Sequence, residues 1–307
     1  MRASVLLLLL AAACTPDFAA QSDVTDLRIL AVQAEPPEAK YDPSQSPPAV
    51  DPVVVTVLAA DPRTANPMTM TFQLCAPTDS RRCDEGPATD PVVRALSPTT
   101  LQVPPAALMQ ALSADDLKGF GGVRVQFSFS VDDGDARGPV YGSKVLLFSP
   151  RGGTPNRNPL IQDLRLTQAG VTFDPETVSP GTTLELPLDV EIGLRPELTA
   201  GSLERYTTTD YRGHPVTLPE QPQYSFFVTP GAEIGVDTAF EPLEGRVAPP
   251  DGLSWIAART AGATGTLWVV VRDGRGGESW VSFAWKAVAS TPSSWRPPTA
   301  RARPVRR

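Results

Sequence analysis

The sequence predicts a mainly β protein built from two tandem antiparallel β-sandwich domains, with one short helix in the first domain. Apolar and polar residues alternate with a period of two in several segments, such as "VRVQFSFSV" from Val123 to Val131 and "LELPLDVEI" from Leu184 to Ile192. Strict alternation is typical of strands that bury one face and expose the other in an antiparallel sheet. The two halves of the chain also resemble each other, which favours two copies of one architecture.

The resemblance between the halves lies in their first and last strands. Residues 26–30 read "DLRIL" and residues 163–167 read "DLRLT". Each half then closes with two apolar strands around an Asp-Gly pair, at residues 133–134 and 273–274. Because Asp-Gly is a common hairpin turn, both halves are predicted to end in a β-hairpin.

Composition divides the chain into segments. The stretch "SPRGGTPNRNP", Ser149 to Pro159, is rich in proline, glycine and asparagine and has no apolar period, which is typical of a linker. "PPAALMQALSADDL", Pro104 to Leu117, has the pattern of a short helix with proline at its start. The predicted order is a lipoprotein signal peptide at residues 1–13, a flexible tether at 14–24, a sandwich at 25–149, a linker at 150–159, a sandwich at 160–289 and a disordered basic tail at 290–307.

The chain opens with a short apolar run that stops at a cysteine. Val5–Ala13 has about half the ~20 residues of a membrane-spanning helix, and Arg2 precedes it as in a secretory signal. The residues "AAAC" that end at Cys14 resemble the lipobox of bacterial lipoproteins, whose cysteine is acylated after cleavage. We therefore expect an exported protein with a lipid anchor on Cys14, at the outer membrane on its periplasmic or surface face. An ordinary signal cleaved at an Ala-x-Ala site is the alternative.

The two remaining cysteines are Cys75 and Cys83, in "CAPTDSRRC". In an oxidising compartment, cysteines across so short a turn are expected to form a disulfide. A metal or redox pair is the weaker interpretation, because the chain has no CxxC motif and its single histidine, His214, is distant in sequence.

The charge distribution argues against nucleic-acid binding. The net charge is −7, yet six of the 27 lysines and arginines lie in the N-terminal segment and the tail, so the body between them is more acidic than the whole. Neutralising phosphates requires clustered Lys and Arg on the folded surface. The tail itself, from Ser290 to Arg307, is a solvated end or a contact for anionic lipid headgroups or for the acidic body.

The run after Cys14 through "DLRILAVQAEPPEA", the "NRNP" linker and "LWVVVRDGRGGESWVSF" resembles uncharacterised surface lipoproteins of myxobacteria and similar Gram-negative bacteria. That resemblance covers most of the chain. It implies immunoglobulin-like or PKD-like sandwiches at the cell surface, and it carries no activity and no catalytic residues. Cys75 and Cys83 are too close in sequence to be the cross-sheet disulfide of true immunoglobulin domains.

No catalytic or metal-binding motif stands out. His214 lies in "DYRGHPV", which resembles neither a nucleophile elbow nor an HExxH helix. Asp132–Asp135 holds three carboxylates, but their spacing is not that of an EF-hand and Arg137 would repel a cation. We expect no catalytic residue, metal or cofactor; a carboxylate-based glycan-active enzyme is the less favoured alternative.

All five tryptophans lie between Trp255 and Trp295. We expect those before the tail to fill a sandwich core rather than to form a sugar-stacking platform, because Trp280 and Trp285 are five residues apart and face opposite sides of a strand.

The best candidate for a binding surface is Arg195–Gln223, the longest stretch of the second half with little alternation, which predicts exposed loop. Tyrosine gives broad amphipathic contact and arginine a rigid fork of donors. The candidate binding residues are Tyr206, Asp210, Tyr211, Arg212 and His214. The sequence thus predicts a non-catalytic, lipid-anchored module for adhesion, glycan binding or envelope assembly, whose partner is an envelope or matrix glycan or protein. A structural spacer or accessory lipoprotein without a ligand is the alternative.

Overall fold

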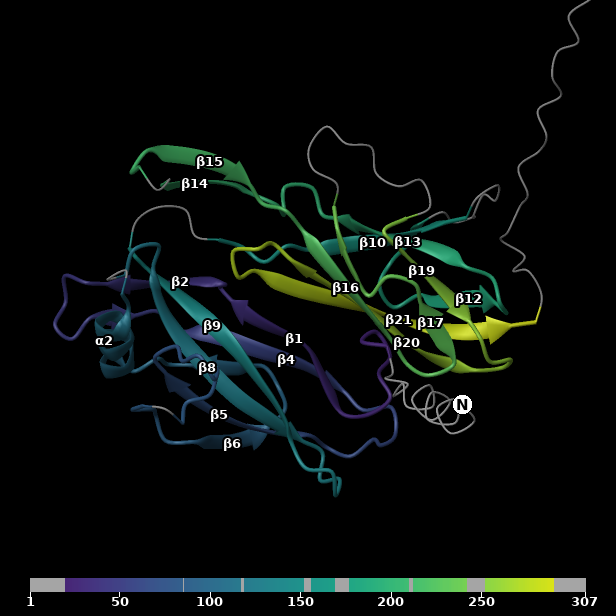
Figure 1. Ribbon diagram of the computed structural model, residues 1–307, viewed down its shortest axis with the longest axis horizontal. Helices are drawn as coiled ribbons and strands as arrows, with labels where there is room; N and C mark the ends of the chain where they lie inside the picture. The colour runs from purple at the N-terminus through teal and green to yellow at the C-terminus, as the bar shows by residue number, and fades with distance from the viewer. Residues whose placement is uncertain are drawn as a thin grey trace, which may run out of the picture.

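The computed structural model describes residues 20–84, 86–116, 119–151, 156–168, 177–209, 212–241 and 252–289. Within these ranges the strands form two successive sandwiches, drawn in purple to teal and in green to yellow (Figure 1). The first contains β1 (Arg28–Glu35), β2 (Glu38–Asp42), β3 (Ala49–Val50), β4 (Val53–Ala60), β5 (Thr69–Cys75), β6 (Val92–Ala95), β7 (Thr99–Leu101), α2 (Pro105–Ala114), β8 (Val123–Asp132) and β9 (Val140–Pro150). Within the described ranges, no helix has both the length and the apolar character that crossing a bilayer requires.

The first sandwich packs a sheet of order β1-β4-β7 against a sheet of order β3-β2-β9-β8-β5-β6. The alternation that predicted strands is confirmed on β8, where every second residue from Val123 to Val131 is at most 3% exposed. Those side chains meet apolar residues of β1, β4 and β5 in one core, because the inward faces of both sheets bury the apolar half of each strand.

The second sandwich contains β10 (Ile161–Thr167), β11 (Thr177–Val178), β12 (Thr183–Pro187), β13 (Ile192–Leu198), β14 (Arg205–Thr209), β15 (Pro215–Pro219), β16 (Gln223–Val228), β17 (Ala232–Ile234), β18 (Thr238–Phe240), β19 (Ser254–Ala258), β20 (Thr264–Arg272) and β21 (Glu278–Val288). Its two sheets have the orders β11-β10-β13-β19-β17 and β12-β21-β20-β16-β18. β14 and β15 form a separate hairpin. Among the tryptophans, Trp285 is 1% exposed in the core, whereas Trp280 faces the other side of β21 and is partly exposed.

The two sandwiches share one topology. β1 and β10 each pair antiparallel with β4 and β13, respectively. The next part of each chain crosses to the opposite sheet, where β2 and β12 pair parallel with the last strands, β9 and β21. The similar segments at 26–30 and 163–167 therefore occupy equivalent places, and the fold class predicted from the sequence is confirmed.

The predicted helix is shorter than its sequence suggested. α2 begins at Pro105 and ends at Ala114, three residues before the predicted Leu117. Asp115 has extended backbone angles, and its side chain accepts a hydrogen bond from the amide of Gly119, which favours a turn over another helical residue. Leu117 itself lies outside the described residues.

The sandwiches meet where β1 packs against β21. A β-bulge at Leu30 interrupts the pairing of β1 with β4, and such an extra residue redirects its side chain. Leu30 is 3% exposed yet belongs to neither core. The same holds for Val270 of β20, which is 0% exposed. The predicted linker contributes to the same junction, because Asn156, Asn158 and Pro159 are buried.

Candidate functional site

The segment predicted as a binding loop is mainly a β-hairpin. β14 pairs with β15 from Arg205 opposite Pro219 to Thr209 opposite Pro215, and Tyr206 lies opposite Leu218. Figure 1 shows this hairpin projecting from the second sandwich above the first. Its strands, "RYTTT" and "PVTLP", are rich in threonine and proline and largely exposed, so their alternation carries little apolar signal.

A cleft of about 800 Å³ lies between the base of this hairpin and the second sandwich. We call it the hairpin cleft. Its lining comes from the hairpin, from β16, from the end of β18 and from the turn between β20 and β21. The lining residues are Leu203, Glu204, Arg205, Tyr206, Leu218, Pro219, Glu220, Gln221, Pro222, Gln223, Phe240, Glu241, Asp273 and Gly274.

The hairpin cleft combines apolar and acidic groups. Phe240 is 58% exposed and Leu218 is 38% exposed, so both leave apolar surface accessible in the cleft. Glu204 and Glu241 supply carboxylates at the same cleft, and Arg195 Nη2 lies 2.6 Å from Glu241 Oε1. The cleft can therefore offer apolar surface and hydrogen-bond acceptors to one ligand.

Arg275 fixes the base of the hairpin to the body. Its guanidinium carbon lies 4.3 Å from the centre of the Tyr206 ring, a cation–π contact. Its Nη1 donates to Glu220 Oε1 at 2.8 Å and to Asn156 Oδ1 at 3.1 Å. Nη2 lies 3.4 Å from Glu38 Oε2, so one side chain links the hairpin, the second sandwich and the first.

Two glutamates around Arg275 have shifted pKa values. Burial raises the pKa of Glu220, whose side chain is fully covered, and the hydrogen bonds from the Glu204 amide and Arg275 only partly offset this. Burial acts in the same direction on Glu38. There, hydrogen bonds from Lys40, Ser149 and the amide of Asn156 outweigh burial, and the pKa of Glu38 is lowered.

The asparagines of the predicted linker complete the junction. Asn156 Nδ2 donates to Asp273 Oδ2 at 2.8 Å. Asn158 Nδ2 donates to the carbonyl of Ala34 at 2.8 Å, and its Oδ1 accepts from the amide of Glu278 at 2.8 Å. Each asparagine lies between the two sandwiches in the chain and helps to hold them together through these hydrogen bonds.

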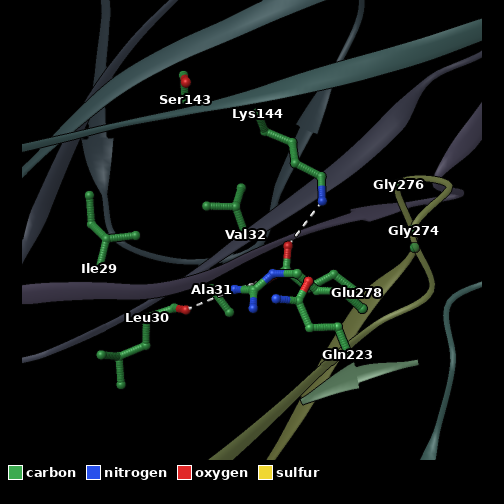
Figure 2. A pocket seen from close by; sticks show the side chains of 12 residues that line it. Ile29, Leu30, Ala31, Val32, Ser143, Lys144, Gln223, Gly274, Gly276 and Glu278 are labelled. Carbon is green, nitrogen blue, oxygen red and sulfur yellow. Dashed lines mark hydrogen bonds and ion pairs between the residues drawn. The ribbon is translucent and has the colours of Figure 1, made fainter. Parts of the chain in front are cut away.

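A second pocket, of about 470 Å³, lies at the junction itself (Figure 2). β1 forms one wall, and β9, β16 and the β20–β21 turn form the others. Lys144 Nζ lies 3.0 Å from Glu278 Oε2, and Arg272 Nη2 lies 2.8 Å from Glu278 Oε1 and donates to the carbonyl of Leu30. These charges bond one another across the domains, so the pocket is part of the junction and offers a ligand few available polar groups.

The structure separates the five predicted binding residues. Tyr206 lines the hairpin cleft. Arg212 and His214 are exposed at the opposite end of the hairpin, beyond the pair formed by Thr209 and Pro215. Asp210 and Tyr211 lie outside the described residues, as does Cys14. Phe240, Leu218 and Arg275 were not among the predicted residues.

The acidic turn at Asp132–Asp135 lies beside a cation from another segment, Arg63. Arg63 bonds Asp61 through its backbone amide and its guanidinium, and it lies 3.3 Å from Asp135. Hydrogen bonds from Arg63, and a further one from Asp133, lower the pKa of Asp61 to about 2 although its burial opposes this. No group of three potential metal ligands occurs in the described part of the chain.

The predicted disulfide between Cys75 and Cys83 is present, with Cα atoms 5.5 Å apart. It closes a loop at the end of β5. The amide of Thr78 donates to Gln126 of β8, and the guanidinium of Arg82 lies 5.1 Å from the ring centre of Tyr141 on β9. The disulfide therefore holds this loop against the outer face of the first sandwich.

No protein-family model matches this sequence, and no curated protein does either. Solved structures with some likeness include a red sea bream transglutaminase (12% identity, TM-score 0.24), covering 85% of this chain and 31% of that one. The match to the D00-D0 domain of intimin (8% identity, TM-score 0.24) covers 84% of this chain and 100% of that one. The match to the two tandem V-type regions of VCBP3, a v-region-containing chitin binding protein (10% identity, TM-score 0.28), covers 85% of this chain and 99% of that one. Likeness at these TM-scores assigns no family and no function.

Proposed function

We propose that the protein is an exported, lipid-anchored, non-catalytic module that binds a glycan in the hairpin cleft. The observation that carries the proposal is the cleft: its volume of about 800 Å³ falls within the ~300–1,000 Å³ of small-ligand sites. A sugar ring presents apolar C–H faces and hydroxyl donors. Phe240 and Leu218 offer surface to the first, and Glu204 and Glu241 accept hydrogen bonds from the second.

The contacts of Arg275 support the same proposal. Because Arg275 holds Tyr206 against the body and bonds the buried Glu220, the base of the hairpin is ordered before a ligand arrives. A site that is already ordered loses less conformational entropy on binding. The exposed apolar side chains, which contribute little to either core, are therefore the ones expected to contribute to binding.

Binding to isolated envelope or matrix polysaccharide tests this function. Phe240→Ala and Leu218→Ala remove apolar surface from the cleft without opening a core, because both side chains are exposed. We expect each to weaken binding about tenfold, as for loss of ~1.4 kcal/mol at a contact residue. Val93→Ala and Val145→Ala are matched controls, since these valines are 67% and 47% exposed on the first sandwich. Cleft variants that bind like the wild type would contradict the proposal.

The junction favours a second candidate, a rigid spacer without a ligand. Arg275, Asn156 and Asn158 bond the sandwiches to each other through buried groups, which is more than a flexible tandem needs. The same experiment separates the candidates. A spacer predicts that no polysaccharide fraction binds and that Phe240→Ala leaves adhesion of whole cells unchanged.

The lipid anchor is a separate part of the proposal. Its support is the sequence around Cys14, a residue outside the described ranges, together with a disulfide that suits an oxidising compartment. Radiolabelled palmitate is expected to label the wild type and not Cys14→Ser. Cys75→Ser/Cys83→Ser serves as the control, because it removes cysteines that do not follow a signal segment. Equal labelling of wild type and Cys14→Ser would exclude the anchor.

A further inference from the structure

The surface that the hairpin cleft presents to a ligand is mainly acidic. Its lining includes four carboxylates and one guanidinium, which belong to Glu204, Glu220, Glu241, Asp273 and Arg205. Arg195 pairs with Glu241 and Arg275 pairs with Glu220, but neither arginine is a lining residue. A ligand in the cleft therefore meets more negative than positive groups.

Two of these carboxylates are used within the fold. The side chain of Glu220 is fully covered, and it accepts hydrogen bonds from Arg275 at 2.8 Å and from the amide of Glu204 at 2.7 Å. Asp273 is 2% exposed, and it accepts two backbone amides through Oδ1 and Asn156 through Oδ2. These two carboxylates hold the turn and the base of the hairpin, so they are not assigned to a ligand.

The carboxylate of Glu204 has cations near it but no hydrogen bond. Its side chain is 19% exposed, and Arg157 Nε and Arg275 Nη1 each lie 3.6 Å from one of its oxygens. That separation is too long for a hydrogen bond. Among the described residues, no group donates a hydrogen bond to either oxygen. A largely covered carboxylate gains most from a donor, because water reaches it poorly. Glu204 is therefore suited to accept a hydrogen bond from a ligand.

Glu241 supplies a second acceptor. Its Oε1 accepts a hydrogen bond from Arg195 Nη2 at 2.6 Å, whereas no residue in the described part of the chain donates to its Oε2. Burial, and then the charge of Glu241, raise the pKa of Tyr224 although Arg195 opposes this. The negative charge of Glu241 thus acts on its surroundings despite the paired arginine.

We infer that the hairpin cleft selects glycans with free amino groups, such as hexosamines that lack the N-acetyl group. The inference rests on the proposed function, because it names the class of glycan that the same cleft binds. An ammonium group brings a positive charge and three hydrogen-bond donors, which Glu204 and Glu241 accept. Charge-assisted hydrogen bonds are about twice as strong as neutral ones, so these carboxylates favour the ammonium over an N-acetyl group. They repel the carboxylate of a uronic acid.

Three oligosaccharides of equal length test this selection. They are oligomers of glucosamine, of N-acetylglucosamine and of a uronic acid, which carry positive, neutral and negative units. We expect the protein to bind the glucosamine oligomer about tenfold more tightly than the N-acetylated one, and the uronic acid oligomer most weakly. Added salt is expected to reduce the difference, because it screens the charges.

Charge-removing variants assign the selection to the two glutamates. Glu204→Gln and Glu241→Gln are each expected to lose most of the preference for glucosamine while still binding the N-acetylated oligomer. Glu197→Gln is the matched control. Arg165 Nη2 lies 2.6 Å from Glu197 Oε1, as Arg195 Nη2 does from Glu241 Oε1, and Glu197 is not a lining residue. Loss of the preference in the control with retention in the cleft variants would overturn the inference.

The pH dependence separates the charge of the ligand from its shape. Raising the pH removes protons from the amino groups of the glucosamine oligomer, so its advantage is expected to disappear in alkaline solution. Binding of the N-acetylated oligomer, which has no amine to titrate, is expected to stay constant over the same range. An advantage that persists after the amines are deprotonated would contradict selection by charge.

The possible results distinguish this inference from the proposed function. Equal binding of the glucosamine and N-acetylglucosamine oligomers, weakened alike by Phe240→Ala, would overturn the amine selection and leave the glycan site intact. Absence of binding to every oligosaccharide and to isolated polysaccharide would overturn both. Displacement of the glucosamine oligomer by a lysine-rich peptide at a lower concentration than by free glucosamine oligomer would assign the cleft to a basic peptide and overturn the inference.

Discussion

The guanidinium of Arg275 lies over the ring of Tyr206, with 4.3 Å between its central carbon and the ring centre. Through this contact, the residue that bonds both sandwiches also orders the base of the hairpin. The hairpin cleft and the domain junction are therefore mechanically connected, and a change at Arg275 is expected to affect both.

Replacing Arg275 should destabilise the protein strongly. Arg275→Ala leaves the fully buried carboxyl of Glu220 without its cation, and we expect the free energy of unfolding in urea to fall by about 3 kcal/mol. Lys286→Ala breaks an exposed ion pair and should cost at most ~1 kcal/mol. Arg275 lowers the pKa of Glu220 against the effect of burial, so Arg275→Ala should raise this pKa further. The folded variant then takes up a proton on Glu220 more readily than the wild type, and its deficit should shrink on acidification. A deficit that does not depend on pH would contradict this account of Glu220.

The junction should make the two sandwiches unfold together. Asn156→Ala/Asn158→Ala removes the side-chain partner of the Glu278 amide and the donor to Asp273 Oδ2, although Asp273 Oδ1 keeps the amides of Arg275 and Gly277. Each buried group that loses its partner is expected to cost about 1–3 kcal/mol. We expect calorimetry to show one transition for the wild type and two for this double variant. Asn66→Ala, whose amide bonds a carbonyl within the first sandwich, should keep one transition. Two transitions in the wild type would show that the junction does not couple the domains.

Acid should weaken the first sandwich through Asp61. The pKa of Asp61 is about 2, below its ordinary value of 3.8, so the folded state favours the ionised carboxylate. Its contribution to stability is complete above pH ~4 and is lost as pH falls toward 2. Asp61→Asn should flatten this part of the profile of unfolding free energy against pH. An Asn variant with the wild-type acid profile would exclude Asp61 as its source.

The disulfide should be detectable both chemically and energetically. The folded body is expected to show no titratable thiol from Cys75 or Cys83 until it is reduced. Cys75→Ala/Cys83→Ala should lower the free energy of unfolding by about 2–3 kcal/mol, because a closed loop of this length restricts the unfolded chain. Two free thiols in unreduced, unfolded protein would contradict the observed pairing.

The sequence was sufficient for features that depend on local pattern. The alternation of "VRVQFSFSV" identifies β8 because burial follows the period of the strand. The two Asp-Gly pairs lie between paired strands as predicted, but the connections, from Val131 to Val140 and from Arg272 to Glu278, are longer than a two-residue turn. Sequence proximity also sufficed for Cys75 and Cys83. The hairpin was predicted as loop because threonine and proline at exposed positions leave no apolar period.

The site depends on contacts that local pattern cannot show. Arg275 lies in "RDGRGG", which reads only as a tight turn, and its partner Glu38 is 237 residues away. Gly277 is the one feature of this turn that hints at a close contact, because glycine is required where another backbone approaches. A Cβ at this position would lie 2.8 Å from the carbonyl oxygen of Arg157. Phe240 lies outside the predicted segment and reaches the cleft through the pairing of β18 with β16.

Amide hydrogen exchange with and without a bound polysaccharide fraction tests the central claim most directly, since it reports where a ligand contacts the chain. Added protection is expected at Arg205–Tyr206, Leu218–Gln223 and Phe240–Glu241, the backbone around the hairpin cleft. The face of β8 and β9 in the first sandwich should exchange as before. Protection that is absent from the cleft, or that lies only on the first sandwich, would show that the hairpin cleft is not the binding site.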